Sequence, residues 1–208
     1  HPPPGPAQWS AKLPGTSLGA LAGFVARFLD VLDVERVHVV GHSMGGAIAA
    51  QLALDHPARV ASLALVSSVG LGEEIEGGYI EGFAQAASRR ELKPQVEKLF
   101  VDPALVTRQM LDDLLEYKRL DGVSELLGQL GGSLFAEGRQ RERPAARLDP
   151  SRTPLPVVWG AQDRIIPPAH AALAPAGATV HVLEGAGHMV QMEKASEVNA
   201  LLKRHFAP

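Results

Sequence analysis

The stretch VHVVGHSMGG, residues 37–46, decides the fold of this chain. It begins within a short β-branched run, RVHVV (36–40), which is typical of a strand buried on both faces. The segment that follows, GGAIAAQLALDHP, has small and aliphatic residues and stops at a proline, which favours a helix. The sequence therefore predicts a strand, a sharp turn and a helix, with Ser43 in the turn.

A serine in such a turn is typical of a nucleophile elbow. Gly41 and Gly45 flank Ser43 at two positions on either side, where we expect side chains to collide as strand and helix pass each other. The turn places the Ser43 hydroxyl at the start of the helix, where the Met44 N–H and the helix dipole can stabilise negative charge. We expect Ser43 to be a nucleophile and Met44 to supply one oxyanion-hole donor; the alternative is a glycine-bounded turn without chemistry.

A serine hydroxyl needs a base, and the base needs an acid to orient it. Asp163 follows the predicted strand LPVVWG (155–160), and His188 follows the predicted strand TVHVLEG (179–185). The chain order Ser, Asp, His is that of α/β-hydrolases. The sequence therefore predicts a catalytic triad of Ser43, Asp163 and His188, in which His188 is the base and Asp163 holds its tautomer.

Other acids and histidines are alternatives for these roles. His42 is expected to shape the elbow rather than to transfer protons, and no pair of ligands at i, i+4 spacing favours a metal site. The competing acids are Asp149, Asp112 and Asp113. The histidines without a role are His38 and His181 in strands, His56 at a helix end, and His170 and His205, which are expected to face solvent.

The pattern on either side of these motifs predicts the fold class. Residues 17–32 and 195–206 repeat apolar side chains at helical spacing, and VASLALVSS (60–68) is a further strand. Alternating strands and helices indicate an α/β fold with a mostly parallel sheet and helices on both faces. We expect a single domain over residues 1–208, with its core at 13–70 and 151–208.

The segment between these two parts of the core, about 71–150, far exceeds an ordinary connection of about 2 to 6 residues. Its periodicity is helical, with Pro and Gly as breaks. We therefore expect a helical cap over the sheet. The predicted cap helices are YIEGFAQAASRR, PQVEKLF, ALVTRQMLDDLLEYKRL and GVSELLGQL.

Composition excludes several classes of function. The chain has 208 residues, 46% of them hydrophobic, and a net charge of −3, which argues against a nucleic-acid partner. There is no cysteine, which suits a reducing compartment and makes the cytoplasm the expected location. The longest apolar stretch, around residues 61–71, is much shorter than the roughly 20 residues of a membrane helix. The start, HPPPGPAQWSAKLPG, shows no leader, so a piece of a longer chain is expected.

Three motifs, GHSMGG, WGAQDRIIP and GAGHMVQME, resemble those of the α/β-hydrolase superfamily. A narrower resemblance extends from about Leu13 to the end of the chain. The cap segment, including LVTRQMLDDLLEYKRLDGV, is similar to the carboxy-terminal hydrolase-like domain of the dihydrolipoamide acetyltransferase subunits of acetoin dehydrogenase complexes.

This resemblance implies acetyl transfer from a lipoyl-lysine thioester to coenzyme A. The implied substrates are a small acyl group and coenzyme A as co-substrate, with the lipoyl group on a separate upstream domain and no tightly bound cofactor. The implied partners are other acetoin dehydrogenase complex subunits. Two alternatives stay open: a free-standing α/β-hydrolase (carboxylesterase or carbon–carbon bond hydrolase), and a non-catalytic assembly domain. Cap residues Arg89, Arg90, Lys118 and Arg119 could contact coenzyme phosphates, although a solvated helix face is favoured.

Members of this family also have early strands and a His-Gly loop with a second oxyanion donor, and neither is recognised here. The N-terminal strands of the sheet are therefore expected to be missing. RVHVV would then be an apolar edge strand that pairs readily with another chain. We expect residues 1–208 alone to be unstable or to associate.

Overall fold

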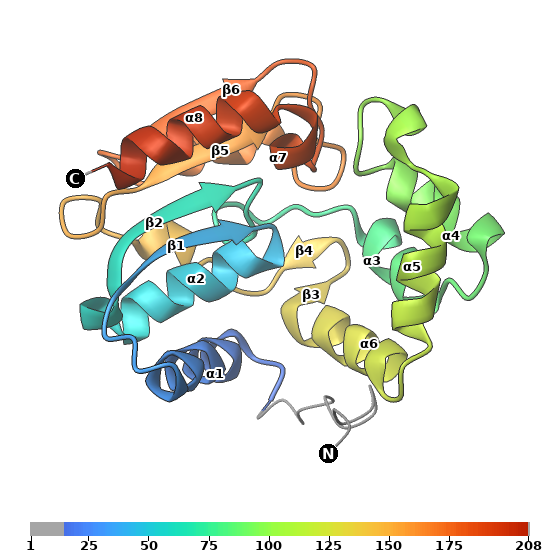
Figure 1. Cartoon of the computed structure of the whole chain (residues 1–208), viewed down its shortest axis with the longest axis horizontal. Helices are drawn as coiled ribbons and strands as arrows, with labels where there is room; N and C mark the ends of the chain where they lie inside the picture. The colour runs from blue at the N-terminus through green and yellow to red at the C-terminus, as the bar shows by residue number, and fades with distance from the viewer. Residues whose placement is uncertain (1–14, 208) are drawn as a thin grey trace.

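The computed structural model describes residues 15–207. The proline-rich start, with the first two residues of the predicted core, lies outside the described residues. The main sheet has four parallel strands in the order β1-β2-β5-β6 (Figure 1). These strands are β1 (Val37–His42), β2 (Val60–Val66), β5 (Pro156–Gly160) and β6 (Thr179–Leu183). The predicted parallel α/β sheet is therefore confirmed.

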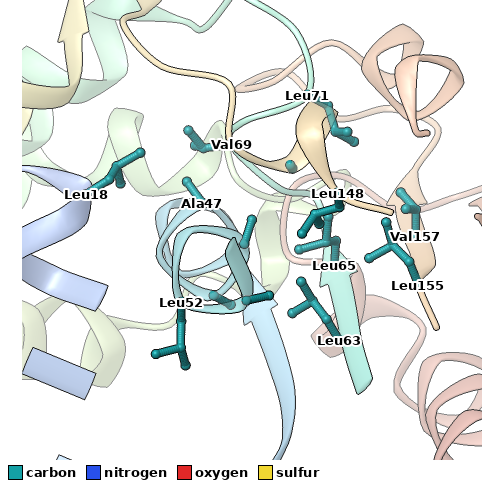
Figure 2. Packing of buried hydrophobic residues seen from close by; sticks show 14 of the residues in the cluster. Leu18, Ala47, Leu52, Leu63, Leu65, Val69, Leu71, Leu148, Leu155 and Val157 are labelled. Atoms are coloured by element: carbon teal, nitrogen blue, oxygen red, sulfur yellow. The ribbon is translucent and has the colours of Figure 1, made fainter. Parts of the chain in front are cut away.

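One face of the sheet is covered by α2 (Met44–Asp55), and α1 (Leu18–Val31) packs against α2. The N-terminus of α1 is capped by the Ser17 hydroxyl, which accepts a hydrogen bond of 3.2 Å from the Ala20 N–H. The predicted helix over 17–32 is thus confirmed. Figure 2 shows the packing on this face, where side chains from α2 and β2 meet those of β5. The labelled residues of these three elements are Ala47, Leu52, Leu63, Leu65 and Val157.

The other face is covered by α7 (Val190–Glu193) and α8 (Ala195–Phe206). Because successive side chains of a strand point to opposite faces, Val66 and Val158 pack on this side, against Val198 of α8. Helices therefore cover both faces, as expected. No helix within residues 15–207 combines the length and the apolar character needed to cross a membrane.

β1 is an edge strand in the described part of the chain. Its exposure alternates, and Val40 retains 46% of its surface. The prediction that RVHVV is buried on both faces is wrong, because only the face that carries Val39 packs against the core, whereas His38 and Val40 on the opposite face stay exposed. The expected apolar edge is confirmed, and the expected association stays a prediction.

The insertion lies beyond the carboxyl ends of β1 and β2 (Figure 1). Its helical character is confirmed. Its helices are α3 (Gly77–Gln85), α4 (Arg89–Glu97), α5 (Arg108–Lys118) and α6 (Val123–Leu134). A small unpredicted hairpin follows, formed by β3 (Phe135–Ala136) and β4 (Arg139–Gln140). Short 3-10 helices occur at η2 (Pro57–Arg59), η3 (Pro103–Leu105), η4 (Ala145–Arg147) and η5 (Pro168–Leu173).

α4 is continuous through Pro94, where the sequence predicts a helix start. The helix begins instead with a capping box, in which Ser88 and Glu91 bond to each other's main-chain N–H. Leu92 and Val96 are fully buried in a cluster formed within the cap. We infer that the capping box and the burial of Leu92 and Val96 offset the loss of the one main-chain hydrogen bond that Pro94 removes.

Candidate active site

The turn between β1 and α2 holds Ser43 in a strained backbone conformation, with φ 53° and ψ −125°. Neighbouring segments fix it there. The Ser43 main-chain N–H donates to the main-chain oxygen of Val66 at 3.1 Å. The main-chain oxygen of Ser43 accepts from the N–H groups of Gly46 at 2.9 Å and Val69 at 3.0 Å. The end of β2 and the chain just after it therefore hold the elbow from outside.

Close packing at the elbow requires glycine at two positions. A Cβ on Gly41 would lie 2.5 Å from the Gly46 Cα, and a Cβ on Gly46 would lie 1.9 Å from the Ser68 Oγ. A Cβ on Gly45 would meet nothing within 4 Å. The predicted steric requirement is confirmed at Gly41 and wrong at Gly45. Gly46 carries it instead, because its Cα rather than that of Gly45 faces the neighbouring strands.

The structure brings the three predicted side chains together. The His188 Nε2 lies 2.9 Å from the Ser43 Oγ, and its Nδ1 lies 2.8 Å from the Asp163 Oδ2. The second carboxylate oxygen of Asp163 accepts from the N–H groups of Ile165 and Ile166 at 2.8 and 3.0 Å. His188 and Asp163 are buried, whereas Ser43 is half-buried. The three groups form one continuous hydrogen-bonded chain.

The positions of the protons in these hydrogen bonds follow from the groups that they join. An ionised carboxylate only accepts hydrogen bonds, so the Nδ1 of His188 carries the proton that faces Asp163. With Nδ1 as the donor, the Nε2 of a neutral ring would offer its lone pair to the Ser43 hydroxyl. This is the arrangement that proton removal from a serine requires.

Met44 is the first residue of α2, directly after Ser43. The N–H groups of a helix's first turn have no acceptor within the helix, and they carry the positive end of its dipole. The Met44 N–H is thus suited to an oxyanion beside Ser43. Its role in an oxyanion hole stays a prediction.

His42, directly before Ser43, is bonded to the backbone of the predicted base. Its Nε2 donates to the main-chain oxygen of His188 at 2.9 Å. Burial, and to a smaller extent the neighbouring His188, lower the pKa of His42 to about 4. A neutral His42 bonded to the backbone of His188 is consistent with the expectation that His42 shapes the site without transferring protons.

The competing acids lie elsewhere. Asp149 accepts hydrogen bonds from Ser151 within a turn. Asp112 pairs with Arg89 in the cap, and Asp113 accepts from a glutamine one turn away on α5. Within residues 15–207, no group of three or more His, Asp or Glu side chains is arranged to hold a metal ion.

Two histidines expected to face solvent do not. His170 is buried, with 3% of its surface exposed, and its Nε2 lies 2.7 Å from the Glu74 Oε2. It packs so closely on the first residues of the insertion that a Cβ on Gly72 would lie 2.4 Å from its ring. His205 is half-buried beside Phe206. In both cases packing covers a histidine that the sequence was expected to leave facing solvent.

Lys118 also departs from expectation. It is 6% exposed, and its ammonium donates to the main-chain oxygens of Phe83 and Ala84 at the end of α3. The predicted solvated helix face is therefore wrong at this residue. Its ammonium is already bonded inside the cap, which leaves it unsuited to a coenzyme phosphate.

Two residues in the quoted motifs were not assigned a role from the sequence. Arg164 follows Asp163, and Glu193 lies five residues beyond His188; both bond to the cap backbone at or just beyond the end of α4. Their position within WGAQDRIIP and GAGHMVQME was the available signal. Their partners are distant in sequence, so spacing could not reveal the contacts.

Comparison with known proteins finds similar chains over nearly the whole length of this one. A dihydrolipoyllysine-residue acetyltransferase component of the acetoin cleaving system from Cupriavidus necator is 62% identical over 203 residues, which cover 98% of this chain and 54% of the relative. The component with the same name from Pseudomonas putida is 49% identical over 206 residues, or 97% of this chain and 55% of the relative. The chain thus spans about half the length of these two curated relatives.

One further relative and one solved structure of similar fold are named hydrolases. A 2-hydroxy-6-oxononadienedioate/2-hydroxy-6-oxononatrienedioate hydrolase from Paraburkholderia xenovorans is 31% identical over 211 residues, covering 93% of this chain and 71% of the enzyme. The structure of a meta-cleavage product hydrolase from Pseudomonas fluorescens superposes with a TM-score of 0.77 at 23% identity, covering 91% of this chain and 71% of that one. The sequence profile of the alpha/beta hydrolase fold matches residues 3–195, and the chain belongs to the α/β-hydrolase fold family.

Proposed function

We propose that this chain transfers acyl groups through an acyl-serine intermediate on Ser43. The proposed reaction moves an acetyl group from a lipoyl thioester to coenzyme A, within an acetoin-cleaving complex of the cytoplasm. The lipoyl group would be carried by a separate upstream domain, and coenzyme A would be a co-substrate. The observation that carries the proposal is the hydrogen-bonded chain from Ser43 through His188 to Asp163. The similarity to acetoin-system acetyltransferases supports the choice of substrate.

In the first half of the proposed reaction, the Ser43 Oγ attacks the thioester carbonyl carbon while His188 takes the hydroxyl proton at Nε2. Asp163 stabilises the imidazolium, and the Met44 N–H donates to the oxyanion. The carbon–sulfur bond then breaks. The proton passes from His188 to the leaving sulfur, which gives a dihydrolipoyl thiol and acetylated Ser43.

In the second half, the thiol of coenzyme A gives its proton to His188 and its sulfur attacks the acyl-serine carbonyl. The bond from the carbonyl carbon to the Ser43 Oγ breaks, and the proton returns from His188 to the serine oxygen. Water in place of the thiol would release acetate. Transfer and hydrolysis therefore differ only in the second nucleophile.

Carbon–carbon bond hydrolysis is a second candidate, favoured by the 31% identity to the Paraburkholderia xenovorans hydrolase. An assembly domain with an unused triad is a third. These candidates predict different products from the same protein. The first gives acetyl-coenzyme A, the second cleaves a vinylogous 1,5-diketone, and the third does neither.

The first test is reaction of Ser43 with a fluorophosphonate probe. We expect the wild type to be labelled, and Ser43→Ala and His188→Ala to lose labelling while they stay folded by circular dichroism. Ser196→Ala, which changes an exposed serine on α8, is the matched control and should be labelled normally. A folded wild type that does not react would exclude the acyl-serine mechanism.

The second test supplies acetyl-dihydrolipoamide and coenzyme A. Formation of acetyl-coenzyme A that is lost in Ser43→Ala supports the transferase. Acetate without acetyl-coenzyme A would identify a hydrolase. Unchanged acetyl-coenzyme A formation by a complex assembled with Ser43→Ala would leave only the assembly role.

A further inference from the structure

The backbone at the end of α4 is bonded to the segment that carries the predicted base. The Glu193 Oε2 accepts from the Gly187 N–H at 2.6 Å, directly before His188. The other oxygen, Oε1, accepts from Val101 at 2.7 Å and from Asp102 at 3.4 Å. One carboxylate thus joins the cap to the loop of His188.

The same stretch of cap is bonded to the segment that carries the predicted acid. The Arg164 Nη2 donates to the main-chain oxygen of Glu97 at 2.9 Å and to that of Phe100. Arg164 adjoins Asp163 in the chain. These carbonyls lie at and just beyond the C-terminal end of α4, where a cation interacts favourably with the helix dipole.

Direct contact reinforces these bonds. The Met189 N–H donates to the Leu99 oxygen at 3.1 Å, and a Cβ on Gly187 would lie 3.0 Å from that same oxygen. The residues on both sides of His188 therefore touch Leu99. The cap backbone cannot move here without changing the surroundings of the imidazole.

The segment is also firmly attached within the cap. Phe100 is 2% exposed and belongs to the apolar cluster of α4 and α5, against which Met189 packs. A displacement of the cap helices would accordingly be transmitted through Phe100. The cap segment 97–102 is the element common to all of these contacts.

We propose that Glu193 and Arg164 are positioning residues that couple the cap, through segment 97–102, to the alignment of His188 and Asp163. Neither side chain bonds to Ser43; each acts on the loop that carries its triad neighbour. The proposal deepens the proposed function and rests on it. It predicts that loosening the cap segment disorders the base and slows acylation of Ser43.

Amide hydrogen exchange tests the coupling without requiring activity. In Glu193→Gln and Glu193→Ala, we expect faster exchange both at Val101 and Asp102 and at the amides around His188. Glu197→Gln removes an exposed carboxylate a few residues along the chain and is the matched control. Faster exchange confined to the two cap amides would overturn the proposal.

The rate of fluorophosphonate labelling tests the consequence. We expect Glu193→Ala and Arg164→Ala to slow labelling of Ser43 about 10- to 100-fold, because small displacements of catalytic groups have effects of this size. The loss should fall on kcat rather than KM for a small acetyl ester, with partial recovery in Glu193→Gln. Arg152→Ala, which changes an exposed arginine, should be labelled like the wild type.

The double variant Glu193→Ala/Arg164→Ala tests whether the two residues act together through cap segment 97–102 or each affects only its own loop. Residues that act through one segment give losses that are not additive. Multiplicative losses in folded protein, or wild-type labelling in Glu193→Ala, would overturn the positioning role while leaving the acyl-serine mechanism intact. An unreactive wild type would instead exclude that mechanism, and the exchange experiment alone would then decide the coupling.

Discussion

The imidazole of His42 bonds to the main-chain oxygen of His188 at 2.9 Å, so the residue before the predicted nucleophile supports the backbone of the predicted base. The two rings lie 4.9 Å apart and are tilted by 51°. This geometry keeps His42 neutral, because its burial and the neighbouring His188 both disfavour a second proton.

The stability of the protein should therefore depend on pH through His42. Its pKa falls from 6.5 in the unfolded chain to about 4 in the folded protein. Between these values the unfolded state binds more protons, so stability is complete above pH 6.5 and decreases as the pH falls toward 4. The contribution of His42 reaches about 3.5 kcal/mol at most, at about 1.4 kcal/mol per pKa unit.

Urea unfolding at several pH values measures this effect in the wild type and in His42→Gln. We expect a shallower loss of unfolding free energy between pH 6.5 and 4 in His42→Gln. Parallel curves for the two proteins would show that His42 does not contribute.

Neighbouring glycines in α2 should respond in opposite directions to alanine. Gly46→Ala places a Cβ against the buried Ser68, and we expect a loss of about 1–3 kcal/mol in unfolding free energy. Gly45→Ala places a Cβ in open space and should be neutral or stabilising by about 0.5–1 kcal/mol. Denaturant unfolding compares the two. A larger loss at Gly45 than at Gly46 would contradict the close approach described for the elbow.

Asp163→Asn should separate catalysis from stability. The asparagine oxygen can accept the N–H groups of Ile165 and Ile166, which preserves the loop. Its amide then donates toward the Nδ1 of His188, which favours the wrong tautomer and should lower turnover about ten-thousandfold. Thermal melting should change little, and Asp149→Asn is the exposed control. Near-normal turnover in Asp163→Asn would assign the orienting role to another acid.

Lys118 should matter for stability rather than for coenzyme binding. Lys118→Ala leaves the Phe83 and Ala84 oxygens without their cationic donor, and we expect a loss of about 2 kcal/mol. Arg90→Ala, at an exposed position of α4, should stay within about 0.5 kcal/mol of the wild type. Weaker coenzyme A binding in a stable Lys118→Ala protein would be the contrary result.

Local pattern was sufficient for most of the elements, though not for the β3–β4 hairpin or the start of α4, and for the order of the predicted triad. The β-branched run before Ser43 and the apolar periods of α1 and α8 reflect constraints between residues close in sequence. Asp163 and His188 could be placed because the carboxyl ends of parallel strands share one edge of a sheet. No long-range contact had to be known for these inferences.

Tertiary structure alone decided the features that depend on distant partners. Gly46 rather than Gly45 is constrained because Ser68, from the segment after β2, lies against it. Lys118 and His170 are buried because α3 and the start of the cap fold over them. The links from Arg164 and Glu193 to the cap join residues far apart in the chain. The sequence by itself determined which residues form the elbow and which strand ends carry an acid and a base. Packing across the sheet and cap determined the distances between these side chains, because the distances depend on contacts between residues that are far apart in the sequence.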